Sequence, residues 1–176
     1  IHDKGKGCVT PEATRSFFHE ISTCPHQELC SGCQYLGKNY AEQMSLKSQH
    51  LLDLIKAQGL LLESPLQYQS ISLDGLRDRL DFSFRDGKMG LYDKNKHFIV
   101  DIQTCSQLSP ALQSWLTEFK SYEFPLERAS LRLRVSPDGK KGLWIDAANI
   151  DIKKLLEETS FLHKMQSLCE VEIGQR

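Results

Sequence analysis

Residues 78–87, Asp-Arg-Leu-Asp-Phe-Ser-Phe-Arg-Asp-Gly, are the stretch of sequence that decides the fold class. Leu80, Phe82 and Phe84 alternate with polar residues, which is the period of a strand with one buried face. The Asp-Gly pair at the end of the stretch is a strong signal for a tight hairpin turn. The sequence therefore predicts a β-hairpin whose return strand begins near Met89.

A second hairpin and several helices surround the first one. Residues 131–135 alternate between apolar side chains and arginine, and a Pro-Asp-Gly turn leads into an apolar strand over 142–146. Paired strands and helices together indicate an α+β fold, with antiparallel β-hairpins packed with about three helices and a Cys-rich loop. One more strand is expected over residues 97–102, and the helices over 40–58, 109–121 and 151–165.

The central domain is expected to span residues 21–168, and its Cys-rich loop and following helix occupy 21–59. Residues 1–20 are expected to form an N-terminal arm or linker, in which a short helix starts at Pro11. Residues 169–176 are typical of the start of another strand.

Composition excludes several classes of protein. The chain has 176 residues, about one domain, and its 40% of hydrophobic residues is enough for a core, so general disorder is excluded. The 22 basic and 23 acidic residues give a formal charge of −1, so any basic surface must be local. The longest aliphatic run, residues 60–62, is far short of the roughly 20 that span a membrane. With no secretory signal visible, we expect a cytoplasmic monomer without a membrane partner.

The motif Cys24-Pro-His-Gln-Glu-Leu-Cys30-Ser-Gly-Cys33 places three cysteines within ten residues. Thiolates bind soft metals, and a compact loop lets several converge on one centre. Structural zinc and cubane iron–sulfur clusters both take four ligands, although the gap of five residues fits a zinc knuckle less well. Free buried thiols are the alternative. The candidates for the fourth ligand are Cys8, Cys105, Cys169 and His26.

The spacing Cys24-x5-Cys30-Ser-Gly-Cys33-Gln34, followed by Tyr40, Gln43 and Lys47, resembles the iron–sulfur segment of RNA (uracil-5-)-methyltransferases. The fourth ligand of that family follows a strand that reads roughly Ile-Val-Asp-Ile. Here residues 99–102 read Ile-Val-Asp-Ile and lead into Cys105, so the resemblance implies Cys105 as the fourth ligand of a 4Fe–4S cluster. It covers residues 24–110 well and 126–150 loosely, and it includes the Leu-Arg-Asp-Arg-Leu stretch at 76–80 and Gly90.

The departures from the family pattern concern function more than ligation. Ser31 replaces a common Gly, and Ser106 replaces the Pro that often follows the fourth Cys. The family's catalytic domain carries a Gly-rich S-adenosylmethionine loop and a nucleophilic Cys in a Ser-Cys-Asn-Pro context, and neither motif occurs in this sequence. The resemblance therefore implies the iron–sulfur, RNA-recognition region alone, with residues 169–176 starting a linker toward an absent catalytic domain. No catalytic residue is assigned.

Basic side chains on the strands are the candidates for contact with ribosomal or transfer RNA. If the apolar residues of 131–135 face the core, Arg132 and Arg134 face away from it. Trp115 and Trp144 lie in apolar patterns and are expected in the core. A zinc-stabilised nucleic-acid-binding module and an electron-transfer protein remain alternative functions. The expected RNA-binding residues are Arg77, Arg79, Arg132, Arg134, Lys140 and Lys141.

Overall fold

The computed structural model describes residues 21–67 and 72–175, which contain four helices and one six-stranded sheet. The contacts between residues divide the chain into two units. One unit includes Tyr35–Leu73, and the other joins Thr23–Gln34 to the residues from Asp74 onward. The expected arm at residues 1–20, with its short helix and Cys8, lies outside the described residues.

The first unit contains helix α2 (Tyr40–Ala57), which confirms the helix expected over 40–58. Asn39 caps it: the Asn39 side chain accepts from the Glu42 N–H at 2.9 Å, and Glu42 accepts from the Asn39 N–H at 3.0 Å. Gly59 ends the helix with a φ of 68°.

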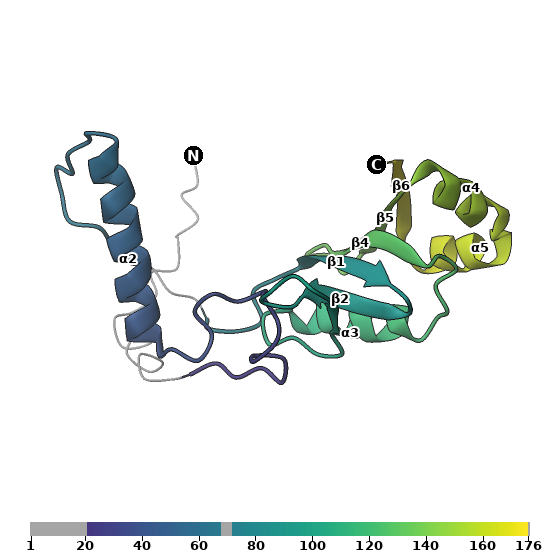
Figure 1. Cartoon of the computed structure of the whole chain (residues 1–176), viewed down its shortest axis with the longest axis horizontal. Coiled ribbons are helices and arrows are strands. Elements are labelled where there is room, and N and C mark those ends of the chain that lie inside the picture. Colours follow the sequence, from purple (N-terminus) through teal and green to yellow (C-terminus); the bar gives the residue numbers. More distant parts are fainter. Residues whose placement is uncertain (1–20, 68–71, 176) are drawn as a thin grey trace, which may run out of the picture. The chain divides into compact units, whose positions relative to one another are not determined.

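The second unit contains the sheet (Figure 1), in the order β3-β2-β1-β4-β5-β6. Both predicted hairpins are confirmed, as the antiparallel pairs β1–β2 and β4–β5. Asp86 and Gly87 have φ angles of 50° and 76°, so the first turn needs two residues that tolerate positive φ. The strands are β1 (Arg79–Arg85), β2 (Lys88–Tyr92), β3 (Ile99–Asp101), β4 (Arg128–Val135), β5 (Lys141–Ala147) and β6 (Glu170–Gln175).

The C-terminal part differs from the sequence prediction in two respects. The single helix expected over 151–165 is two helices, α4 (Asn149–Glu157) and α5 (Thr159–Leu168). Leu155 and Met165 are both fully buried in the same core, whereas one straight helix would separate them by about 15 Å along its axis. The chain then returns as β6, which pairs with β5 in parallel, so the sheet is antiparallel except at this edge.

The core lies between the sheet and helix α3 (Pro110–Lys120), which confirms the helix expected over 109–121. Trp115 is fully buried as predicted, and its indole N–H donates to the Gly142 carbonyl oxygen at 3.2 Å. The prediction that Trp144 lies in the core is wrong. Leu143 and Ile145 take the inward positions of β5, so strand alternation leaves Trp144 half-buried on the opposite face, which we call the outer face.

None of the helices in the described ranges is long and apolar enough to cross a membrane.

Candidate metal centre and nucleic-acid interface

The loop from Cys24 to Cys33 is held against the end of β2 by backbone hydrogen bonds. Ser31 donates twice to the Tyr92 carbonyl oxygen, from its N–H at 3.1 Å and from its hydroxyl at 2.7 Å. The Lys94 N–H donates to the Leu29 carbonyl oxygen at 2.9 Å. The loop is therefore held at the end of β2 by local pairing, and its Cys30 also packs against the hydrophobic core.

Asp93 organises the turn to which this loop pairs. Asp93 pairs with Cys30 in an isolated antiparallel bridge, and only 3% of its surface is exposed. The carboxylate accepts N–H bonds from Asn95 (3.0 Å), His97 (2.5 Å) and Phe98 (2.9 Å). Burial by itself would raise the pKa of Asp93, but these backbone donors hold it below the ordinary value.

Cys105 follows β3, and hydrogen bonds with Gln113 of α3 hold its backbone in place. The Cys105 N–H donates to the Gln113 side-chain oxygen at 3.0 Å, and the Gln113 amide donates to the Gln103 carbonyl oxygen at 3.0 Å. The Leu108 N–H donates to the Cys105 carbonyl oxygen at 3.1 Å. Two elements far apart in the sequence thus present cysteines to one side of the unit.

The four predicted ligands are electrostatic neighbours. Burial raises the pKa of the Cys33 thiol, and negative charge on Cys105, Cys30 and Cys24 raises it further, while Arg77 opposes the rise. Burial likewise raises the pKa of Cys105; the Gln107 N–H opposes this, and Cys24 and Cys30 add to it. Ionisation of one thiol would therefore disfavour ionisation of the next, unless a bound cation neutralised the thiolates.

Gly32 is a position where a larger residue would displace the Leu91 side chain. A Cβ at this position would lie 2.6 Å from Leu91 Cδ1 and 3.3 Å from Cys30 Sγ. The Gly32 N–H donates to Cys30 Sγ at 3.3 Å. The Ser-Gly pair between two of the cysteines therefore has separate tasks: the serine attaches the loop to β2, and the glycine leaves room beside the thiol.

Among residues 21–67 and 72–175, no three His, Cys, Asp or Glu side chains lie in an arrangement that would ligate one metal ion. Charges on neighbouring thiols affect one another's pKa over distances longer than a coordination bond. The pKa shifts are therefore compatible with the lack of a ligand arrangement among the described residues. The four thiols share one neighbourhood without being assembled around a single point. Half-buried thiols from two fixed segments are a donor set that fits a thiolate-ligated metal or cluster.

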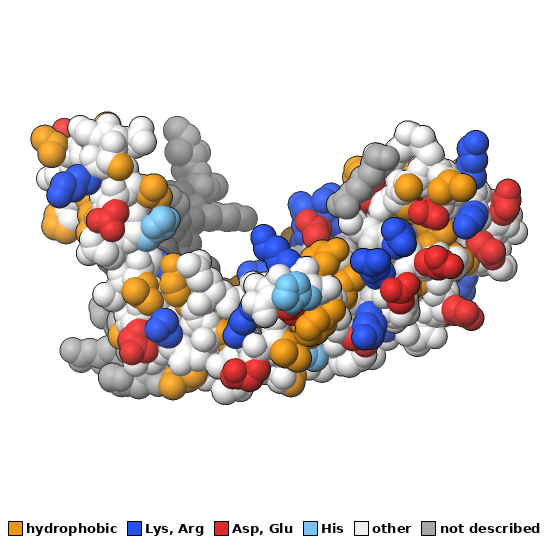
Figure 2. Space-filling model, viewed as in Figure 1, with side chains coloured by type: hydrophobic (Ala, Val, Ile, Leu, Met, Phe, Trp, Pro, Cys, Tyr) orange, Lys and Arg blue, Asp and Glu red, His pale blue; other side chains and the backbone are white. Residues whose placement is uncertain are grey.

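On the outer face, Arg132 lies between an acid and an aromatic ring. Its guanidinium pairs with Asp81 at 2.6 Å and lies 5.3 Å from the centre of the Trp144 ring. Arg79 also pairs with Asp81, at 3.0 Å, and Arg134 pairs with Glu172 at 3.6 Å. Basic and acidic side chains are interleaved over the sheet-containing unit in Figure 2.

Asp81 is therefore shared between two arginines. Its pKa would be raised by burial alone, but hydrogen bonds from Arg79 and Arg132 hold it below the ordinary value. The acid keeps both guanidinium groups on the outer face, directed away from the core.

The other three expected RNA-binding residues lie elsewhere. Lys141 points to the core side, where its ammonium pairs with Glu118 at 2.5 Å and lies 5.2 Å from the centre of the Trp115 ring. Lys140 pairs with Asp138 at 3.5 Å in the β4–β5 turn. Arg77 is an electrostatic neighbour of two of the cysteines.

Sequence reasoning missed the part played by Asp93. A signal was present, because an Asp followed by Lys-Asn-Lys is typical of a turn whose carboxylate accepts from the backbone ahead of it. Nothing local in the sequence shows that Cys30 would pair with this turn.

The fold and the cysteines define the class of protein: an α+β domain with a thiol-rich loop at the end of β2 and arginines on the outer face of the sheet. No protein-family model matches the chain. An uncharacterised RNA methyltransferase of Bdellovibrio bacteriovorus is 48% identical over 161 residues, which are 90% of this chain and 42% of that protein. The 23S rRNA (uracil(1939)-C(5))-methyltransferase RlmD of Psychromonas ingrahamii is 30% identical over 124 residues, 65% of this chain and 28% of that protein.

The chain is thus homologous to RNA methyltransferases over much of its own length. It spans less than half the length of these curated relatives.

Proposed function

We propose that this chain is the iron–sulfur, RNA-recognition region of an S-adenosylmethionine-dependent RNA uracil-C5 methyltransferase. Cys24, Cys30, Cys33 and Cys105 would hold a 4Fe–4S cluster. The observation that carries the proposal is that these four thiols, from two segments separated by 71 residues, are electrostatic neighbours. The homology to an enzyme named as a uracil-C5 methyltransferase supports it.

The cluster would have a structural task. Each of the four thiolates would bind a different iron and fill the one position that the sulfides leave, so no iron would be open to a substrate. Bound there, the cluster would join the Cys24–Cys33 loop to the segment after β3. The loop's other described attachments are hydrogen bonds to residues 92–94 and the packing of Cys30 against the core. Without the cluster, Cys33 and Cys105 would stay protonated, because burial and the neighbouring thiols raise their pKa, and the loop would depend on those attachments alone.

Arg77 would serve the cluster rather than RNA directly. It opposes the rise in pKa at both Cys33 and Cys105, so its positive charge favours the thiolate form that metal ligation requires. Its backbone also belongs to the site, since the Arg77 N–H donates to the Gln107 carbonyl oxygen at 2.8 Å.

RNA would lie against the outer face, where Arg79, Arg132 and Arg134 are held by acids. Such pairs can exchange a carboxylate for a phosphate, and the carboxylate keeps the guanidinium in place until then. Methyl transfer would belong to the parent enzyme's catalytic domain, with S-adenosylmethionine as its methyl donor.

Metal and sulfide content, measured on protein purified without oxygen, tests the cluster. We expect about four irons and four sulfides per chain and a broad absorption near about 400 nm. Cys105→Ala should lose both, while Cys169→Ala, a change at a thiol outside the loop, should keep them. One zinc without sulfide would instead make the chain a zinc-stabilised nucleic-acid-binding module. A fully loaded Cys105→Ala variant would remove Cys105 from the ligand set.

Salt-dependent binding of a single-stranded RNA tests the outer face. The double variant Arg132→Gln and Arg134→Gln should bind about tenfold more weakly, with a log–log salt slope smaller by about 2. The control is Lys153→Gln and Lys154→Gln, which removes the same charge from exposed positions of α4. Equal losses in both variants would mean that charge alone, and not this face, attracts the RNA.

A further inference from the structure

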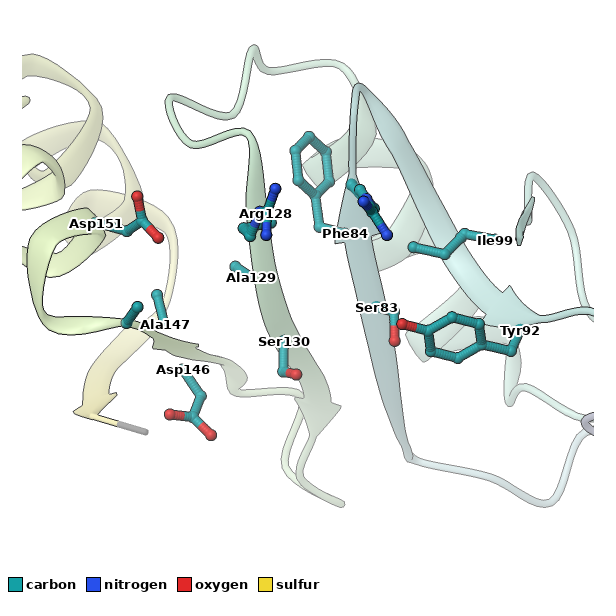
Figure 3. A pocket seen from close by; sticks show the side chains of 12 residues that line it. Ser83, Phe84, Tyr92, Ile99, Arg128, Ala129, Ser130, Asp146, Ala147 and Asp151 are labelled. Atoms are coloured by element: carbon teal, nitrogen blue, oxygen red, sulfur yellow. The ribbon is translucent and has the colours of Figure 1, made fainter. Parts of the chain in front are cut away.

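The outer face carries a second feature, a cavity of about 480 Å³ at the end of the sheet away from Arg134. Figure 3 shows side chains from three neighbouring strands, Ser83, Ser130 and Asp146, lining it. They form one cross-strand row, since Ser130 is the register partner of both Ser83 and Asp146. Short side chains in this row leave the hollow, and none of the proposed RNA-binding residues lines it.

Two arginines form the basic end of this outer-face pocket. Arg85 and Arg128 are direct cross-strand partners, and both line the pocket. Like charges directly opposite each other destabilise a sheet, so an anion bound between them would relieve the repulsion. Asp151 of α4 is a carboxylate that also lines the pocket. Arg85 has a single exposed ion pair, with Asp86 at 3.6 Å, and no ion pair to Arg128 is found in the part of the chain that the structure describes. Exposed pairs of this kind are weak.

The opposite end of the pocket offers acceptors and hydroxyls. Asp146 lies diagonally from Arg128 on the neighbouring strand, at a spacing of about 7–8 Å between such positions. Ser83 and Ser130 lie in the same cross-strand row as Asp146, next to the row of the two arginines, and each can donate and accept. The pocket therefore fits a ligand that is anionic at one end and a hydrogen-bond donor at the other, rather than a bare phosphate ion.

Tyr92 supplies an aromatic wall. It lines the pocket from β2 with 42% of the residue exposed, and its hydroxyl is directed toward β1 in Figure 3. A partly exposed ring on the wall of a pocket that also holds two arginines is a surface on which an unpaired base can stack.

We propose that the outer-face pocket binds one unpaired nucleotide of the RNA. Arg85 and Arg128 bind its phosphate, Tyr92 stacks on its base, and Asp146 accepts from a ribose hydroxyl, a contact that favours RNA over DNA. This inference rests on the proposed RNA-recognition function. It adds a site for one nucleotide, separate from the contacts that Arg132 and Arg134 would make with the RNA phosphates.

The test is a titration of the isotope-labelled full chain with uridine 5′-monophosphate, followed through backbone amide shifts in NMR. We expect shifts concentrated at Ser83, Ser130 and Asp146, and weaker binding of inorganic phosphate, of uridine and of the deoxy monophosphate. Arg128→Gln should weaken binding about tenfold, as loss of one charge-assisted contact does. Arg85→Gln provides a second variant if the first unfolds, and Lys153→Gln is the matched control.

Equal affinity for phosphate and for the nucleotide would overturn the proposal, since it would leave an anion site only. Shifts elsewhere, or pocket variants that bind as the parent does, would overturn it as well. Binding of a labelled single-stranded RNA distinguishes a failure of the pocket proposal from a failure of the proposed function. If RNA binding depends on Arg132 and Arg134 but not on Arg128, the pocket proposal alone fails. If the nucleotide binds in the pocket but no RNA binds, the proposed function fails.

Discussion

Gly90 is the residue that lets β3 lie against β2. A Cβ on Gly90 would lie 1.7 Å from the Val100 carbonyl oxygen and 2.8 Å from its carbon, both backbone atoms that cannot turn aside. We therefore expect Gly90→Ala to destabilise the domain by about 2–4 kcal/mol, as forced backbone shifts in a packed element do. Denaturant unfolding measures this loss.

Gly142→Ala is the control for that measurement. Its Cβ would also meet a close atom, Arg134 Nε at 2.8 Å, but this atom belongs to a long side chain that can move. The control should lose much less stability. Similar losses in the two variants would mean that the close approach of β2 and β3 is not the cause.

Cys169 is a half-buried thiol whose ionisation opposes folding. Burial raises its pKa from the ordinary value of 9.0 to about 11, with Lys141 opposing the rise. The unfolded chain therefore releases this proton at lower pH than the folded chain does. The contribution to stability is fully present below about pH 9 and is lost as the pH rises toward 11.

We expect the free energy of unfolding to fall over that range, and to fall less steeply in Cys169→Ala, which has no thiol to ionise. Unfolding followed at several pH values compares the two slopes. The same slope in both proteins would show that other groups carry the dependence.

At the scale of elements, the turn after β2 decides whether the cysteine loop stays in place. Asp93 uses both carboxylate oxygens, one for His97 and Phe98 and the other for Asn95. In Asp93→Asn one of these oxygens becomes an NH₂ group, which cannot accept, so a buried N–H loses its partner. We expect the proposed cluster to be lost to a chelator several-fold faster, as measured by the decay of its absorption.

Asp86→Asn is the matched change in the turn at the other end of β2, which joins β1 to β2. The Asp86 side chain is exposed, and asparagine tolerates its positive φ of 50°. This variant should lose the cluster at the parent rate. Faster loss in both variants would mean that any change in a β2 turn acts on the loop.

Strand alternation and turn residues were sufficient to predict both hairpins, because each signal lies within a few residues of the structure it specifies. The strand expected to start within residues 169–176 is present as β6, but its parallel pairing with β5 and the break between α4 and α5 were not predictable in this way. Leu155 and Met165 turn toward one core only when the rest of that core exists. The same limit applied to Trp144, since either face of β5 satisfies its local pattern.

For the whole molecule, local sequence patterns do not show which distant residues share a surface. The cysteine spacing indicated a centre, and alternation placed Arg132 and Arg134 on the face away from the core, as the structure has them. The cross-strand pairing of Arg85 with Arg128 depends on the register between β1 and β4, which are separated by two strands and a helix in the sequence. Register is a property of the assembled sheet.

That assembly connects the cysteine loop to the outer-face pocket through Tyr92. The Tyr92 carbonyl oxygen accepts both bonds from Ser31 of the loop, and the Tyr92 side chain lines the pocket. A loop released from its cluster would hold this strand end less firmly, and a stacking ring must be ordered to bind a base at low entropic cost. We expect cluster-free protein, prepared by chelation, to bind single-stranded RNA several-fold more weakly than the loaded protein while its sheet stays folded.

Fluorescence anisotropy measures the affinity, and circular dichroism reports the fold. Ser31→Ala removes one of the two bonds to Tyr92 without touching a thiol, so it should weaken RNA binding in the same direction while keeping its iron. Ser106→Ala, a serine change beside the fourth cysteine, is the control and should keep both iron and affinity. RNA affinity that is the same with and without the cluster would separate the two sites. The cysteines would then stabilise the loop without supporting the surface that meets the RNA.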